Sequence, residues 1–158
     1  MKKNSWNFAG FTLVELLLAV LILGFTLVGL IQVFIRCSAL SELSQNKTLV
    51  MSELQGKMEE IRNYDYDSIA TDYASGGTPG HTFALSQTNG MGVIYIDEFT
   101  AGDADLLRIK IVASWEDKYG RIIGGDFDLD GAVGSGETVD AEGDLFSIAT
   151  VISLIAKR

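Results

Sequence analysis

The sequence predicts an α+β fold, in which one long N-terminal helix packs on a small antiparallel β-sheet. Three observations support this prediction. Residues 11–62 have the apolar spacing of a helix and contain no proline. Several later runs are β-branched or alternate between apolar and polar residues, as strands with one buried face do. Few helical patterns follow residue 68, so the strands are expected to form a sheet whose apolar face covers the helix.

The first element is an apolar stretch over residues 11–35, in which Glu15 is the only charged residue. As a helix this stretch would be about 37 Å long, which exceeds the roughly 30 Å hydrocarbon core of a bilayer. We therefore predict a single membrane-spanning helix. Lys2 and Lys3 precede it, and because positively charged flanks stay in the cytoplasm, the C-terminal part is expected outside the cytoplasm.

The second element is an amphipathic continuation of this helix over residues 36–62. Its apolar residues recur at spacings of three, four and seven, which places them on one stripe. The stripe contains Leu40, Leu43, Val50, Met51, Leu54, Met58 and Ile61. No proline or glycine pair interrupts the junction, so one helix is expected from about Thr12 to Arg62. A coiled coil is the alternative, which the short and irregular stripe disfavours.

Residues 63–158 are expected to form the antiparallel β domain. It begins with a loop rich in glycine, serine and threonine that contains the only proline. The predicted strands are residues 91–99, 106–117 and 145–157, with residues 81–87 as a weaker fourth candidate. In the second of these runs, the odd-numbered residues from 107 to 115 are apolar, whereas Arg108, Lys110 and Ser114 lie on the opposite face.

An acidic segment over residues 126–137 matches the calcium-loop pattern D-x-D-x-D-G-x5-E at every fixed position. The candidate ligands are Asp126, Asp128, Asp130, the backbone carbonyl of Ala132, and Glu137. Four carboxylates within a dozen residues repel one another, so we expect a structural Ca2+ ion to order the loop. Three further acids could extend the site, namely Asp140, Glu142 and Asp144. The flanks are not helical in pattern, so the loop is expected to join strands; a solvated acidic hairpin loop without an ion is the alternative.

Composition excludes several classes of function. The chain has 21 acidic and 12 basic residues and a net charge of -9, so phosphates would repel it and no nucleic acid is expected as a partner. Cys37 is the only cysteine, which rules out an internal disulfide and a multi-cysteine zinc site. His81 is the only histidine, and no nucleophile–histidine set or phosphate-binding glycine pattern is present. We therefore do not expect an enzyme.

The stretch from Gly10 to Glu15 reads Gly-Phe-Thr-Leu-Val-Glu and is followed by some twenty apolar residues. With the short basic leader before it, this stretch resembles the type III signal of type IV prepilins and type II secretion pseudopilins. The resemblance implies that residues 1–10 are a leader peptide. It also implies that a prepilin peptidase cuts between Gly10 and Phe11 and then methylates the new amine of Phe11. The pilin-like fold that it implies is the α+β arrangement predicted above.

The same resemblance implies a structural subunit of a type IV pilus or a type II secretion pseudopilus. Its partners would be homologous subunits and an assembly platform in the bacterial inner membrane, and the filament would be periplasmic or on the cell surface. Glu15 of one subunit would pair with the Phe11 amine of a neighbour and thereby offset the desolvation of both charges.

Two features of major pilins are missing from this sequence. The helix has no proline past its membrane midpoint, unlike many major pilins, and the chain has no C-terminal cysteine pair. Both absences favour a minor pilin or a minor pseudopilin. The alternative function is a membrane-anchored, calcium-ordered binding domain that does not polymerise.

Overall fold

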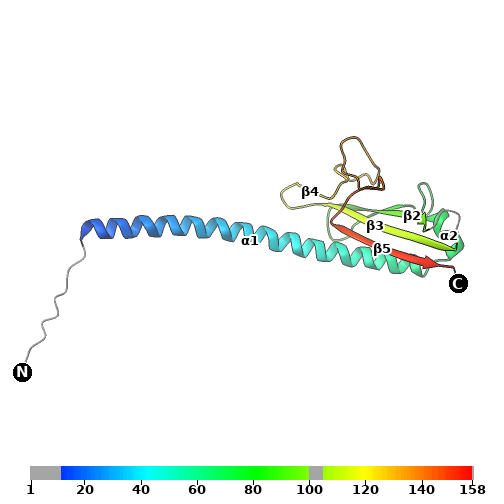
Figure 1. Ribbon diagram of the computed structural model, residues 1–158, viewed down its shortest axis with the longest axis horizontal. Helices are drawn as coiled ribbons and strands as arrows, with labels where there is room; N and C mark the ends of the chain where they lie inside the picture. Colours follow the sequence, from blue (N-terminus) through cyan, green and yellow to red (C-terminus); the bar gives the residue numbers. More distant parts are fainter. Residues whose placement is uncertain (1–11, 100–104, 158) are drawn as a thin grey trace, which may run out of the picture. The chain divides into compact units, whose positions relative to one another are not determined.

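A computed structural model describes residues 12–99 and 105–157 of the chain (Figure 1). It confirms the predicted α+β class, because a long helix is followed by a five-stranded antiparallel sheet. The chain divides into two compact units, one up to Glu42 and one from Leu43 onward. The first unit contains the apolar part of the helix, and the second contains the rest of the helix together with the sheet.

The long helix, α1 (Leu13–Arg62), runs through 50 residues and has nearly the predicted bounds. It begins after Thr12, whose side-chain oxygen Oγ1 accepts a hydrogen bond from the Glu15 backbone N–H over 3.3 Å. This bond satisfies one of the donors that every helix leaves free in its first turn. The helix ends at Arg62, where the following Asn63 side chain donates to the Glu59 carbonyl over 2.9 Å.

The predicted apolar stripe of α1 lies against the sheet from Leu43 onward, whereas its first predicted member, Leu40, is 66% exposed. Its buried members are Val50, Leu54, Met58 and Ile61. Leu43 and Met51 are only partly buried and pack at the margin of the same core. The charged residues between them tie the helix to the sheet and its turns. Glu53, for example, accepts hydrogen bonds from the backbone N–H groups of Ser86 and Gln87 over 2.9 and 3.0 Å.

The sheet is built around one long central strand. The remaining elements are α2 (Tyr66–Asp72), β1 (Thr82–Ala84), β2 (Gly90–Glu98), β3 (Leu106–Glu116), β4 (Ile122–Ile123) and β5 (Ala149–Ala156). All pairings are antiparallel: β3 pairs with β2 along one edge and with β4 and β5 along the other, and β1 pairs with β2. The four predicted strands are therefore present. The sequence predicted neither α2 nor β4, which are too short to show a period.

The two faces of β3 have the predicted composition, but both are buried. On the helix-facing side, Ile109, Ile111 and Trp115 are fully buried, and each large apolar side chain of this kind contributes about 1.5–3 kcal/mol. On the opposite side, Lys110 and Ser114 are also buried. The segment between β4 and β5 covers this face, where Leu145 packs with residues of β2 and β3. This segment carries both acidic clusters.

Candidate functional site

The apolar half of α1 is the first candidate functional region. The structure contains one helix that is long and apolar enough to cross a membrane, among the residues it describes. Every large apolar side chain from Leu13 to Ile35 is more than half exposed, so nothing in the described chain covers them. Thr26 satisfies its hydroxyl within the helix by donating to the Leu23 carbonyl over 2.8 Å. Such internal satisfaction is what a lipid environment requires.

Glu15 lies in the first turn of this helix, where its charge is favourably placed near the positive end of the helix dipole. Thr12 and Glu15 have the spacing of a capping box, in which Thr accepts a bond from the third helical residue. Our sequence analysis missed this second explanation for Glu15, although the Thr-x-x-Glu spacing was the signal for it. The predicted cleavage point between Gly10 and Phe11 lies outside the described residues.

The acidic loop over residues 126–137 is the second candidate region, and it lies between β4 and β5 without a flanking helix. The structure brings together Asp126, Asp128 and Asp130. One carboxylate oxygen from each of them lies within 4.8 Å of the others. Asp128 and Asp130 are exposed, whereas Asp126 is only 1% exposed. The three residues that the pattern places at the start of the loop therefore form one oxygen cluster.

Asp126 is held in place by bonds to its backbone and to one of its carboxylate oxygens. Its N–H donates to Ser114 Oγ over 3.3 Å, and its Oδ2 accepts from the Gly131 N–H over 3.0 Å. Its other carboxylate oxygen, Oδ1, is buried and has no hydrogen-bond partner among the described residues. Burial raises the pKa of Asp126, although several backbone N–H groups oppose this effect.

Glu137 closes the loop. Its Oε1 accepts from the Phe127 N–H over 3.1 Å and its Oε2 accepts from the Gly134 N–H over 2.5 Å. The N–H of Ala132 donates to Asp130 Oδ1 over 2.7 Å. These bonds fold the segment back on itself, so that the last acid of the pattern lies near the first, and the charge of Glu137 raises the pKa of Asp126. Of the five predicted ligand residues, the structure groups the carboxylate oxygens of Asp126, Asp128 and Asp130, while Glu137 lies in the same folded-back loop outside that group.

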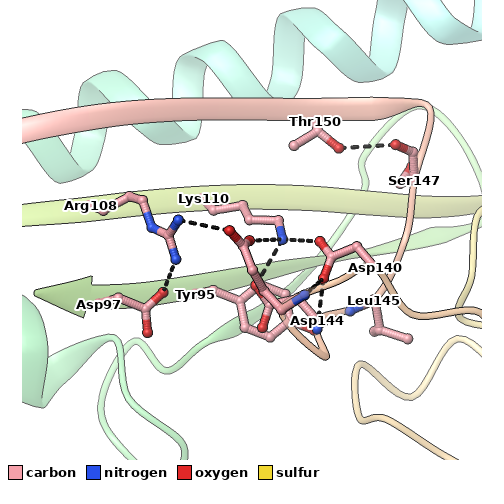
Figure 2. A network of polar contacts seen from close by, with 10 residues as sticks. Tyr95, Asp97, Arg108, Lys110, Asp140, Asp144, Leu145, Ser147 and Thr150 are labelled. Carbon is pink, nitrogen blue, oxygen red and sulfur yellow. Dashed lines mark hydrogen bonds and ion pairs between the residues drawn. The ribbon is translucent and has the colours of Figure 1, made fainter. Parts of the chain in front are cut away.

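The second acidic cluster does not extend the first but surrounds Lys110 (Figure 2). Lys110 comes from β3, is 4% exposed, and forms ion pairs with Asp140, with Asp144 over 2.8 Å and with Glu142 over 3.2 Å. Arg108 adds a further ion pair with Glu142 over 2.9 Å. These three acids form a group separate from Asp126, Asp128 and Asp130, and Lys110 and Arg108 offset two of their three negative charges.

Figure 2 also shows how this cluster is fastened to the sheet. The Tyr95 hydroxyl oxygen on β2 accepts a hydrogen bond from the Leu145 N–H over 3.1 Å. Lys110 Nζ lies 5.7 Å from the centre of the Tyr95 ring, within cation–π range. Arg108 also pairs with Asp97 of β2 over 3.1 Å. The segment from Asp140 to Leu145 is therefore bound to two strands through charged and aromatic side chains.

The ion pairs around Lys110 shift the ionisation of its partners. Burial alone would lower the pKa of Lys110, but hydrogen bonds to Asp140, Asp144 and Glu142 outweigh this effect and raise it. Lys110 in turn lowers the pKa of Asp140. For Glu142 the larger cause of its lowered pKa is Arg108, followed by Lys110. These shifts favour the charged forms of Lys110, Asp140 and Glu142 near neutral pH.

Stability is expected to fall at acid pH because of this cluster. A carboxylate whose pKa is lowered in the folded chain stabilises the fold above its unfolded pKa, and this contribution is lost as the pH falls through the folded value. Because the pKa of Lys110 is raised in the folded chain, its ion pairs stabilise the fold fully below about pH 10. The contribution of the cluster to the free energy of unfolding is therefore complete between about pH 5 and pH 10. Urea unfolding of the full chain in detergent should show lower stability at pH 4 than at pH 7.

A variant separates this effect from that of other carboxylates. Lys110→Met removes the cation that lowers the pKa of Asp140, so its stability should depend less steeply on pH between 7 and 4 than that of the unmodified chain. Trp115 is fully buried and is the only tryptophan after residue 10, so its emission reports unfolding. Equal slopes for the two chains would contradict the assigned role of the cluster.

Comparisons with protein-family models, with curated proteins and with solved structures found no match. The assignment of a function therefore depends on two features of the chain itself. One is the exposed apolar helix with its acid in the first turn. The other is the closed acidic loop with a buried, unpartnered carboxylate oxygen.

Proposed function

We propose that this protein is a filament subunit of the type IV pilin and type II secretion pseudopilin class. In this proposal a prepilin peptidase cuts after Gly10, and the apolar half of α1 packs among the helices of other subunits. The observation that carries the proposal is a helix that begins within the Gly-Phe-Thr-Leu-Val-Glu signal, has the acid of that signal in its first turn, and continues with an apolar part of membrane length. Before assembly this helix anchors the chain in the inner membrane.

The exposed surface of the span supports a role in helix association. Its apolar side chains have no partner within the described chain, so lipid or other helices must cover them. Glycines at positions 24 and 29 have open space around them, which lets another helix backbone approach closely. A plain membrane anchor would need neither the acid nor the leader signal.

Glu15 distinguishes a polymerising helix from an anchor. A carboxylate costs up to about 2.5–3.5 kcal/mol at the centre of a membrane helix and less near an interface. The Thr-x-x-Glu spacing of a capping box would account for a polar residue at this position, but glutamine suits that position as well as glutamate does. A charge is needed only if a cation meets it. We propose that this cation is the Phe11 amine of a neighbouring subunit, so that the pair fixes the axial register of the filament.

The compact unit from Leu43 onward would then form the surface of the filament. Its acidic composition and lack of a catalytic set agree with a structural or contact-making role. The unbroken α1 without proline supports a minor pilin or minor pseudopilin rather than a major pilin. The second candidate is an anchored, calcium-ordered binding domain that does not polymerise, which the unpartnered oxygen of Asp126 favours without excluding a filament.

Mass spectrometry of the N-terminus tests the proposal. When the chain is produced in cells that contain a prepilin peptidase, the purified protein is expected to begin at Phe11 and to carry one methyl group on its amine. Gly10→Val should block cleavage because the peptidase reads the residue before the cut. Gly24→Val is the matched control, since nothing lies within 4 Å of a side chain added there.

Three outcomes of this experiment have distinct meanings. Cleavage and methylation in the unmodified chain and in Gly24→Val, but not in Gly10→Val, would support the proposal. A chain that retains Met1 in the presence of the peptidase would overturn it and favour the anchored binding domain. Cleavage elsewhere than between Gly10 and Phe11 would also overturn it, because Glu15 would then lie at the wrong distance from the new amine.

A further inference from the structure

The buried Asp126 is the one acid of the loop that the described chain leaves incompletely satisfied. Its Oδ2 has the Gly131 N–H, whereas its Oδ1 is buried without a partner. A buried carboxylate oxygen without a donor is costly, because burial removes its water and nothing replaces it. The atom therefore indicates a ligand, and because Asp128 and Asp130 each have an oxygen within 4.8 Å of an oxygen of the same carboxylate, that ligand would be a cation.

We propose that the loop over residues 126–137 binds one Ca2+ ion through the carboxylates of Asp126, Asp128, Asp130 and Glu137 and the backbone carbonyl of Ala132. Two oxygens on opposite sides of a Ca2+ ion at 2.3–2.6 Å lie about 4.6–5.2 Å apart. The three aspartate oxygens lie within 4.8 Å of one another, so one ion can contact all of them. Glu137 is not part of this group of oxygens and accepts the N–H groups of Phe127 and Gly134, so in this proposal it completes the site only when the loop closes on the ion.

The structure discriminates between the two acidic clusters of the chain. Asp140, Glu142 and Asp144 are equally close together, but Lys110 and Arg108 form ion pairs with them and offset two of their three negative charges. No lysine or arginine pairs with Asp126, Asp128 or Asp130 among the ion pairs that the structure records in its described residues. The first cluster therefore has no recorded protein cation to offset its charge, whereas two cations offset most of the charge of the second.

The proposed ion would fasten the loop to the sheet. Asp126 bonds to Ser114 on β3, and a side chain added to Gly131 would meet Thr82 of β1 at 2.5 Å. The loop is therefore anchored at two points on the sheet, and the ion would draw its exposed acids towards the buried one. Outside the cytoplasm, an affinity of the order of 10⁻⁴–10⁻³ M suffices to keep such a site occupied.

Calorimetry and thermal unfolding of the full chain in a neutral detergent test this inference. The protein is stripped with EGTA, the chelator is removed, and CaCl2 or MgCl2 is added to millimolar concentration. One Ca2+ ion is expected to bind per chain and to raise the melting temperature followed by Trp115 emission, and renewed EGTA should reverse the shift. Asp126→Asn and the exposed Asp128→Asn should each weaken binding by about tenfold or more, because ligand charge sets affinity.

Asp140→Asn is the matched control from the second cluster and should leave Ca2+ binding unchanged. If Asp126→Asn fails to fold, the Ca2+ affinity of Asp128→Asn alone tests the inference. The Asp128 side chain is exposed, so its replacement should not prevent folding. The absence of both binding heat and a melting shift at millimolar Ca2+ would overturn the inference. So would loss of binding in Asp140→Asn but not in Asp128→Asn, or an equal response to Mg2+. These measurements use unassembled chains, so their failure would leave the proposed filament function untouched.

Discussion

Replacing Glu15 with glutamine is expected to abolish incorporation into filaments while membrane insertion and the start of α1 stay intact. Glutamine remains compatible with a capping box, because either Glu or Gln can occupy the third helical position of that motif. It removes only the negative charge that the neighbouring Phe11 amine is proposed to meet. The measurement is the amount of this protein in sheared filaments, compared with the amount in the membrane fraction, for both chains.

Thr12→Ala is the control for this prediction. It deletes the hydroxyl that accepts the Glu15 N–H and so weakens the helix start by about 1 kcal/mol, but it keeps the charge. Assembly of this variant should remain near that of the unmodified chain. If Glu15→Gln assembles normally and Thr12→Ala does not, then Glu15 serves the helix cap and the proposed pairing with Phe11 is wrong.

Replacing Lys110 with methionine is expected to destabilise the folded unit by about 3 kcal/mol, at the low end of the range for breaking a buried ion pair. Methionine has a similar length, so the packing of the stem is kept. Asp140 and Asp144 would face each other without a cation, although their partial exposure lets water relieve part of the repulsion. The measurement is urea unfolding of the full chain in detergent, followed by Trp115 emission.

Lys157→Met is the matched control for this substitution. Lys157 pairs with Asp67 over 2.5 Å, and both side chains are substantially exposed. Exposed pairs of this kind contribute little in water, so the control should lose much less stability than Lys110→Met. Equal losses in the two variants would mean that Lys110 behaves as a surface lysine, and that other contacts hold the segment between β4 and β5 on the sheet.

Local pattern was enough to predict much of the fold. The unbroken apolar and amphipathic spacing predicted α1 within a residue at each end, because helix periodicity extends over many turns there. The alternation in residues 106–117 predicted which side of β3 faces the helix. The elements that were missed, α2 and β4, have seven and two residues, and such lengths carry no period that a sequence can show.

The sequence by itself determined the long helix with its single acid, the faces of the strands and the spacing of the acidic loop. The tertiary structure alone decided that Lys110 is buried and forms ion pairs with Asp140, Glu142 and Asp144, while Asp126 keeps an oxygen without a hydrogen-bond partner in the described part of the chain. The physical reason is distance along the chain. Lys110 and its acids are about thirty residues apart, and an irregular segment brings them together. Periodicity reports only that a strand buries one face, and it contains no information about what covers the other.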